Sequence, residues 1–214
     1  MPIFYQQELN EHTRIGVWKI EEAESFFYPR IPLSREITHP HKRLQHLAGR
    51  HLLSYLFPDF PLDEIRIADT RKPFLEKDPY HFSISHCGDF AAAIVSTKNR
   101  VGVDIELITP KVERVADKFL TEAEKSILFA GHLPPASYRK LLTIMWSAKE
   151  ALYKWYGSGQ VDFRAHMQLA TNSLLDAGAD GEMILPFWFM REQKQLLQVQ
   201  ARAFGDLELT WVSG

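Results

Sequence analysis

The chain has 214 residues, which is enough for one large domain or two small ones. Apolar residues make up 45% and charged residues 24%, so the composition is typical of a globular protein with ample apolar material for a core. The 25 Lys and Arg residues nearly balance the 27 Asp and Glu residues, and the overall charge therefore predicts neither nucleic acid nor a membrane surface as a partner.

Targeting signals are not evident in the sequence. Residues 1–5 lack the basic and apolar regions of a signal peptide, and no uninterrupted apolar run reaches the roughly 18 residues of a membrane span. Cys87 is the single cysteine, so it cannot form an internal disulfide. These features favour a reducing cytoplasm as the location.

The first thirty residues predict a small structural unit without chemical groups of note. Residues 3–7 and 14–20 are expected to form strands around a polar turn, and residues 21–27 a short helix that prolines end.

A basic helix is predicted within residues 34–57, where apolar side chains recur at helical spacing. Arg43 and Arg50 are two turns apart on one face, and guanidinium groups bind phosphate oxygens well. The same face could instead be an ordinary solvated surface. Histidines in this stretch suggest zinc, but the usual cysteine partners are missing.

The middle of the chain contains two turns with polar groups. Residues 65–68 read as a strand, followed by a basic turn that contains Lys72 and Pro73. Residues 81–89 and 90–95 predict a strand, a tight turn and a second strand. Ser85 and His86 lie where the first of these strands gives way to the turn, so they could bind phosphate oxygens or have a purely structural role.

Residues 101–107 alternate between apolar and other side chains, as expected of a strand. Asp104 and Glu106 share the face opposite the apolar one, where their charges repel each other unless a cation lies between them. Mg²⁺ prefers such oxygen ligands. The alternative is an exposed acidic strand face.

Two helices are predicted next. Thr121 and Glu124 form a capping box that starts one helix. A second helix is expected from about residue 137, in which Trp146, Glu150 and Lys154 follow at four-residue steps on one face. Glu150 and Lys154 could form a simple surface ion pair, or Glu150 could complete a magnesium site with the two upstream carboxylates.

After a glycine-rich break, residues 183–190, 196–204 and 207–212 are apolar or alternating. They predict an antiparallel meander that covers the helices.

In this order the signals resemble the 4'-phosphopantetheinyl transferases, specifically the larger, single-chain, surfactin-synthetase-activating type. The resemblance covers about residues 43 to 157 and rests on five segments: Lys72-Pro73, Ile84-Ser85-His86-Cys87-Gly88, Val101-Gly102-Val103-Asp104-Ile105-Glu106, Phe119-Leu120-Thr121-Glu122-Ala123-Glu124 and Trp146-Ser147-Ala148-Lys149-Glu150-Ala151-Leu152-Tyr153-Lys154. Cys87 is a small departure, because the family often has a serine there.

The resemblance implies an α+β fold of two similar halves with a pseudo-twofold relation, each an antiparallel sheet packed with a long helix. The halves would be residues 1–100, with the basic helix, and residues 101–214, with the carboxylates. The implied enzyme is a holo-[acyl-carrier-protein] synthase that moves phosphopantetheine from coenzyme A to a serine of an acyl or peptidyl carrier protein and releases 3',5'-ADP. Two related halves in one chain could work as a monomer.

The resemblance also implies roles for individual residues. Mg²⁺ would be held by Asp104, Glu106 and Glu150. Glu150 and Lys154 would be the catalytic pair, with Lys154 at the phosphates and either Glu150 or a water held by the metal as the base. The coenzyme would be bound by a group of basic and small residues, namely Arg43, Arg50, Lys72, Pro73, Ser85 and His86.

Two other functions fit parts of the pattern. A magnesium-dependent nuclease could use the same acidic residues and lysine, although the basic residues do not form the long stripe that would follow a nucleic-acid backbone. A non-catalytic module that binds coenzyme A or a carrier would be expected to have lost one of the acidic residues or the lysine, and all are present here.

Overall fold

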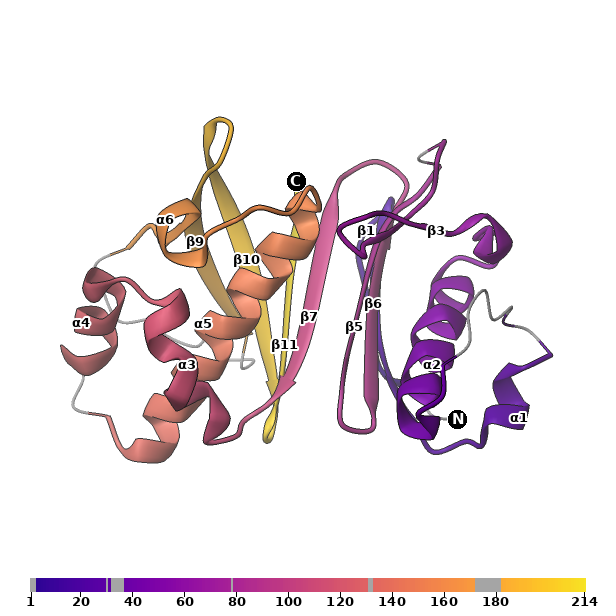
Figure 1. Ribbon diagram of the computed structural model, residues 1–214, viewed down its shortest axis with the longest axis horizontal. Helices are drawn as coiled ribbons and strands as arrows, with labels where there is room; N and C mark the ends of the chain where they lie inside the picture. Colours follow the sequence, from indigo (N-terminus) through magenta and orange to yellow (C-terminus); the bar gives the residue numbers. More distant parts are fainter. Residues whose placement is uncertain (1–2, 30, 32–36, 78, 131–132, 172–181) are drawn as a thin grey trace.

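The computed structural model describes residues 3–29, 31, 37–77, 79–130, 133–171 and 182–214. Two antiparallel sheets pack face to face, and each is covered on its outer face by one long helix (Figure 1). The order of layers is therefore helix, sheet, sheet, helix. The α+β class with antiparallel sheets and helices, which the sequence predicts, is confirmed.

The first sheet has the strand order β1-β2-β6-β5. Its strands are β1 (Ile3–Asn10), β2 (Thr13–Lys19), β5 (His81–Cys87) and β6 (Phe90–Ser96). The predicted N-terminal hairpin is present. Its turn, at Glu11 and His12, is shorter than expected, because both strands extend further toward it. A separate two-stranded ribbon joins β3 (Arg66–Ile67) to β4 (Pro73–Phe74) and presents the basic turn between them.

The second sheet has the strand order β7-β11-β10-β9-β8. Its strands are β7 (Val101–Leu107), β8 (Met167–Leu169), β9 (Glu182–Met190), β10 (Lys194–Phe204) and β11 (Leu207–Ser213). The last three form the predicted meander, and β11 returns to pair with β7.

The two long helices are α2 (Pro40–Leu56) and α5 (Pro135–Tyr156). The shorter helical segments are α1 (Glu24–Phe27), η1 (Leu62–Glu64), α3 (Lys111–Phe119), α4 (Glu122–Ala130) and α6 (Phe163–His166). The helix predicted within residues 34–57 begins at Pro40, and residues 34–36 of that stretch lie outside the described residues. The sequence interpretation missed α3, which is short and strongly polar on its outer side.

The two sheets share one connection. In each, the strand that precedes the long helix, β2 or β7, pairs with the last strand of the sheet in chain order, β6 or β11. The apolar side of β7 faces the first sheet, where Val101, Val103 and Ile105 lie in one cluster with Ile15 and Ile94. This leaves the acidic side of β7 facing α5, as the alternation predicts.

The two sheets also meet edge to edge, because β5 and β7 lie side by side (Figure 1). Side chains of β5 accept hydrogen bonds from the backbone of β7. The Val103 amide donates to Ser83 Oγ over 3.1 Å, and the Leu107 amide donates to Cys87 Sγ over 3.4 Å. This seam brings the serine and histidine segment of the first half beside the carboxylates of the second.

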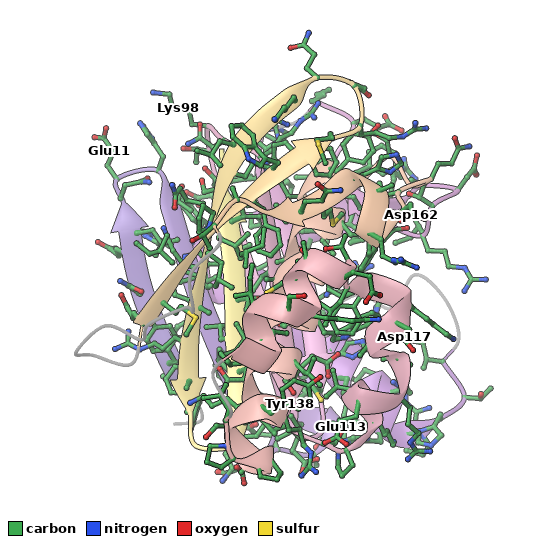
Figure 2. All side chains as sticks on the ribbon, turned by 90° about the vertical axis from the view of Figure 1, so that its left-hand side faces the viewer. Glu11, Lys98, Glu113, Asp117, Tyr138 and Asp162 are labelled. Atoms are coloured by element: carbon green, nitrogen blue, oxygen red, sulfur yellow. The ribbon has the colours of Figure 1, made fainter. Side chains whose placement is uncertain are left out.

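Helix α3 packs against the outer face of α5 near its start. Arg139 of α5 donates from Nε to Glu113 Oε1 of α3 over 2.6 Å, and Figure 2 shows Glu113, Asp117 and Tyr138 on this side of the molecule. Within the described part of the chain, none of the helices is both long enough and apolar enough to cross a membrane.

Gly102 allows α5 to cross β7 at close range. A Cβ at this position would lie 2.0 Å from the carbonyl oxygen of Ala151 and 2.7 Å from the amide nitrogen of Trp155, both backbone atoms of α5. Backbone atoms of a packed helix cannot move aside as a side-chain end can. The glycine therefore determines how near the helix, with Glu150 and Lys154, lies to the strand that carries Asp104.

We expect Gly102→Ala to lower the free energy of unfolding by about 1–3 kcal/mol, because overpacking in a well-packed core typically costs that much. Urea denaturation measures this loss. Gly16→Ala is the matched control, since its Cβ would meet the ends of Leu52 and Leu56 at 3.3 Å and these can adjust. Equal losses in the two variants would contradict the assignment.

Candidate active site

Asp104 is the most highly connected carboxylate of the seam. Its side chain is almost fully buried, with 3% of the residue exposed. Oδ1 accepts hydrogen bonds from Ser85 Oγ at 2.8 Å and from Lys154 Nζ at 2.6 Å. Oδ2 accepts from Ser147 Oγ at 2.9 Å. Asp104 thus joins β5, β7 and α5 at one point, and the exposed acidic strand face considered from the sequence does not exist at this residue.

Ser147 extends this network into β11. Its hydroxyl has one hydrogen, which is donated to Asp104, so the 2.9 Å contact with Thr210 requires the Thr210 hydroxyl to be the donor. Ser147 and Thr210 are both fully buried.

Glu106 lies two residues along β7 on the same face and has different partners. Cys87 Sγ donates to Oε2 over 3.4 Å, and Trp146 Nε1 donates to Oε1 over 3.3 Å. Burial and the neighbouring Asp104 carboxylate raise the pKa of Glu106 above its ordinary value. Burial also raises the pKa of the Cys87 thiol, to about 11, so this thiol is protonated at neutral pH and can donate to Glu106.

Glu150 faces the same region from α5. Burial and then the Asp104 carboxylate raise its pKa to about 7, with a smaller contribution from Glu106, while Lys154 opposes the shift. Trp146, Glu150 and Lys154 thus share one helix face directed at β7, as their spacing predicts. The ion pair that the sequence suggested as an alternative is formed with Asp104 and not with Glu150.

The three carboxylates have the oxygen donors and the charge of a divalent-cation site, and their negative charge is only partly balanced by a cationic side chain. Oxygen donors of this kind suit Mg²⁺, and the raised pKa values of Glu106 and Glu150 show that their negative charges are poorly compensated. As the described residues stand, no group of three acidic, histidine or cysteine side chains is arranged to hold a metal ion. The residues thus fit Mg²⁺ by their oxygen donors and their negative charge, although their side chains are not arranged around a common point.

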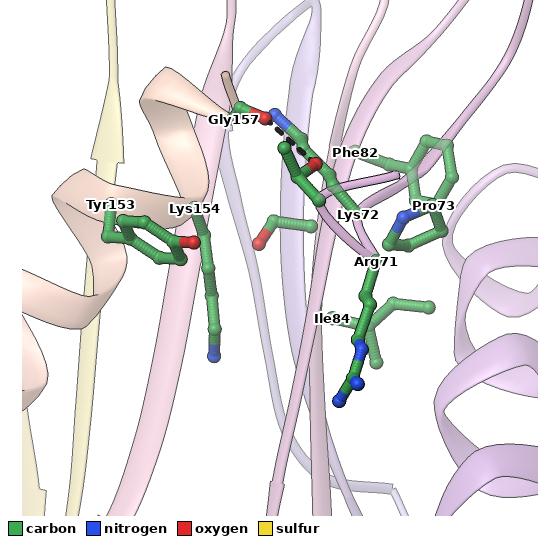
Figure 3. A pocket seen from close by; sticks show the side chains of 10 residues that line it. Arg71, Lys72, Pro73, Phe82, Ile84, Tyr153, Lys154 and Gly157 are labelled. Carbon is green, nitrogen blue, oxygen red and sulfur yellow. Dashed lines mark hydrogen bonds between the residues drawn. The ribbon is translucent and has the colours of Figure 1, made fainter. Parts of the chain in front are cut away.

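A pocket of about 210 Å³ opens beside Lys154, between α5 and the turn that precedes β4. Tyr153 and Lys154 line it from α5, and Arg71, Lys72 and Pro73 line it from the turn (Figure 3). Thr70 Oγ1 donates to the Gly157 carbonyl over 3.3 Å and closes one end, as the dashed line in Figure 3 shows. The predicted lysine and proline of this turn thus lie across the pocket from the predicted catalytic lysine.

The turn itself holds Arg71 in an unusual backbone conformation, with φ of 66°. Hydrogen bonds from the Arg71 amide to the Ala68 carbonyl and from the Ala68 amide to the Lys72 carbonyl close the turn at 2.8 and 2.9 Å. Non-glycine residues in this region are uncommon and are often found at functional sites. Arg71 is a pocket residue that the sequence interpretation passed over.

His86 and Ser85 lie at the seam, but the two arginines of α2 are engaged elsewhere. Partial desolvation lowers the pKa of His86, and the Lys42 and Lys154 ammonium groups lower it further, so the ring is neutral at pH 7. Arg43 donates from Nε to Glu24 over 2.8 Å and from a terminal nitrogen to the Ile37 carbonyl over 2.6 Å. Only 4% of Arg50 is exposed.

Comparisons with known proteins indicate a family for the chain. Residues 100–203 match the family described as the 4'-phosphopantetheinyl transferase superfamily. The chain is 32% identical over 139 residues to the 4'-phosphopantetheinyl transferase AcpT of Escherichia coli O157:H7, which covers 61% of this chain and 69% of that relative. It is 36% identical over 116 residues to enterobactin synthase component D of Salmonella typhi, covering 53% of this chain and 47% of that relative.

The chain belongs to the 4'-phosphopantetheinyl transferase superfamily. The predicted enzyme class is thereby confirmed, with coenzyme A and carrier proteins as the substrates of the family. The nuclease considered from the sequence finds no support in these relatives.

The transferase also contains a buried ion pair that the sequence interpretation did not recognise. Lys149 is fully buried, and its ammonium donates to Glu124 Oε2 at 2.8 Å and to the carbonyls of Phe119 and Phe163 at 2.6 and 3.2 Å. Glu124 also accepts from the Thr121 amide at 2.8 Å, which confirms the capping box. Lys149, directly before Glu150, thus anchors α5 to α4 and α6.

Other residues of the site could have been found from the helix spacing. Ser147 precedes Glu150 by three positions and Lys154 by seven, so it lies on the same helix face. The sequence alone does not assign Ser147 to the site, because a small polar residue in a helix can have many roles. Tyr153 and Arg71 gave no signal beyond their neighbours, since only the fold places them opposite each other.

The raised pKa of Glu150 predicts a pH-dependent stability. The Glu150 carboxyl ionises near pH 4.5 in the unfolded chain and near pH 7 in the folded protein. Its charge therefore destabilises the fold progressively over that range and fully above it. We expect Glu150→Gln to raise the melting temperature relative to the parent protein at pH 8 in EDTA, with little difference at pH 4.5.

Thermal unfolding followed by circular dichroism at the two pH values measures the effect. The control is Glu64→Gln, which alters an exposed carboxylate on η1. A melting temperature of Glu150→Gln that stays equal to the parent at pH 8 would mean that the Glu150 charge is not penalised in the folded protein.

Proposed function

We propose that this transferase moves 4'-phosphopantetheine from coenzyme A to a serine hydroxyl of an acyl or peptidyl carrier protein, with release of 3',5'-ADP, at the cleft between its two halves. The observation that carries the proposal is the position of Lys154. Its ammonium lies on the carboxylate cluster, and its side chain lines the pocket that Arg71 and Lys72 border. A phosphate held at this position would face cations on one side and a potential metal site on the other.

The coenzyme is assigned to this pocket and its surroundings. Lys72 and Pro73 border the pocket, and Ser85 and His86 lie along the adjoining seam. A neutral imidazole and a hydroxyl can donate hydrogen bonds to phosphate oxygens. The roles proposed for Arg43 and Arg50 require a rearrangement on binding, because Arg43 now contacts Glu24 and Arg50 is buried.

Asp104, Glu106 and Glu150 are the proposed ligands of Mg²⁺. When bound, this ion would supply positive charge against the pyrophosphate oxygens on which charge develops. The fit rests on the carboxylate oxygens themselves and on the raised pKa values of Glu106 and Glu150, which indicate unbalanced negative charge.

Glu150 is also the candidate general base for the carrier serine. A carboxyl whose pKa lies near 7 accepts a proton more readily than an ordinary glutamate, and this matches the pH at which the base must work. Lys154, one turn later, would donate to the phosphate oxygens. Its compact ammonium on a flexible stem can follow the charge as the bond to the leaving group breaks.

The finer classification is likewise proposed. Residues 1–100 and 101–214 are taken as two halves of one enzyme of the larger, surfactin-synthetase-activating type. One chain contributes to the cleft from both halves, through β5 and the turn at residues 70–73 on one side and β7 and α5 on the other. A monomer therefore suffices for the reaction, and a cytoplasmic location suits the single thiol.

The test of the function is the intact mass of an apo acyl carrier protein after incubation with this protein, coenzyme A and Mg²⁺. We expect the carrier to gain one phosphopantetheine and to gain none in EDTA. Asp104→Asn should slow transfer by about 10² or more, a usual effect of removing one electrostatic group from an active site.

Asp206→Asn is the control for this variant, because Asp206 lies in the exposed turn between β10 and β11. It should retain the parent rate. Failure of several apo carriers to gain mass, from a protein that binds coenzyme A, would overturn the transferase assignment in favour of a binding module.

Lys72→Ala should weaken coenzyme A binding by about tenfold or more, because a hydrogen bond to a charged group contributes about 1.5–3 kcal/mol. Isothermal titration calorimetry without carrier protein measures the dissociation constant. Lys77→Ala removes an equal charge from an exposed site nearby and should leave the constant unchanged. A similar effect of both substitutions would indicate only a general electrostatic attraction.

A further inference from the structure

Lys154 occupies the position on Asp104 that a divalent cation would otherwise take. Its ammonium is 2.6 Å from Asp104 Oδ1 and 2.8 Å from Ser85 Oγ. The other oxygen of Asp104 already accepts from Ser147. The carboxylate therefore has both oxygens engaged, one of them by a full positive charge.

The rest of the cluster lacks that compensation. Glu106 accepts hydrogen bonds from Cys87 and Trp146, which are neutral donors. In the described part of the chain, the ion pair of this cluster is the one between Lys154 and Asp104, and Glu106 and Glu150 take part in none. The single ammonium of Lys154, at one edge of the cluster, therefore leaves most of the negative charge of the cluster uncompensated. The cluster still attracts a cation of higher charge.

Lys154 is also placed to move. About a quarter of its side chain is exposed, at 26%, and it lines the pocket beside Arg71 and Lys72. Figure 3 shows the Lys154 side chain extending down from α5, with the Arg71 side chain on the opposite side of the pocket. A lysine stem has four rotatable bonds, so the ammonium can turn from Asp104 into the pocket while the helix stays in place.

Lys149, on the same helix, is a lysine whose side chain is held in place by its surroundings. Its side chain is fully buried, and three oxygen atoms from three segments accept its hydrogen bonds. Lys154 has two partners, both on the strands of the seam, and an open pocket next to it. The two lysines therefore differ in mobility although they are five residues apart.

We propose that Lys154 is a place-holding cation, which occupies Asp104 in the metal-free protein, gives up this position when a divalent cation binds, and then turns into the pocket toward the coenzyme phosphates. This inference rests on the proposed function of the cluster and deepens it, because it makes metal binding the event that releases the phosphate-binding lysine. Two like charges cannot share one carboxylate oxygen at hydrogen-bond distance without a large Coulomb penalty.

The proposal predicts opposite effects of one substitution. Lys154→Met should tighten the binding of Mn²⁺ to the protein without coenzyme by about tenfold or more, since the competing ammonium is gone. The same substitution should slow phosphopantetheine transfer. A lysine that only helps to organise the cluster would weaken metal binding when removed.

Titration of free Mn²⁺ by electron paramagnetic resonance measures the affinity of each protein in its metal-free, coenzyme-free form. Lys154→Arg keeps the charge and should retain an affinity close to that of the parent. Lys140→Met is the matched control on the same helix, because Lys140 lies 3.6 Å from Glu208 and does not contact Asp104. It should change the affinity by less than about twofold, because substitutions that share no contact with a site usually act independently of it.

Nitrogen-15 NMR of the lysine ammonium groups tests the movement directly. We expect the Lys154 signal, assigned by its loss in Lys154→Met, to shift or broaden as Mg²⁺ is added without coenzyme. The signal of the buried Lys149 should stay unchanged and serves as the internal control. A Lys154 signal that is unaltered at saturating Mg²⁺ would overturn the exchange.

The outcomes separate this inference from the function beneath it. Equal Mn²⁺ affinities of the parent and Lys154→Met would overturn the place-holding role and leave the metal assignment intact. Absence of Mn²⁺ binding by both would overturn the role together with the metal ligands. Transfer to the apo carrier is measured separately, so it decides the enzymatic function in either case.

Discussion

The buried carboxylate of Asp104 is the interaction on which this arrangement depends. A buried charge is tolerated only when it is paired and hydrogen-bonded, and here the partners come from two elements other than the strand that carries Asp104. Ser85 belongs to the first sheet, while Ser147 and Lys154 belong to the helix that covers the second. Satisfying one charge therefore brings the two halves of the chain to a common point, and the pocket and the other two carboxylates lie around that point.

The close crossing of α5 over β7 gives this network its short distances. Gly102 removes the side chain that would hold the helix away, and the Lys149–Glu124 pair fixes the helix from its other side. The segment around Glu150 thus combines two kinds of residue. Lys149 faces the interior and holds the helix, whereas Glu150 and Lys154 face the seam and are the residues proposed for the chemistry.

The sequence predicts much of this site because its signals are local. The alternation of β7 and the four-residue steps of α5 correctly place Asp104, Glu106 and Trp146 on facing surfaces. The burial of Asp104 could not be predicted, because it depends on β5, which lies about twenty positions away and packs edge to edge without a backbone ladder. The ion pair of Arg43 could not be predicted either, since its partner Glu24 comes from a four-residue helix whose position no periodicity reveals.

The pairing of β7 with β11 has a consequence for how the protein folds. Asp104 lies opposite Thr210, so the strand that carries the carboxylates finds its sheet neighbour only about a hundred positions later in the chain. Such a non-local pairing requires a long loop to close before its contacts are gained, which makes it a slow step. The first sheet has two hairpins, β1–β2 and β5–β6, but these are also joined by a non-local pairing of β2 with β6, from Lys19 opposite Phe90 to Thr13 opposite Ser96. The strand and helix that bear the acidic residues are therefore synthesised before β11, and the pairing of β7 with its sheet neighbour can form only once that last strand is available.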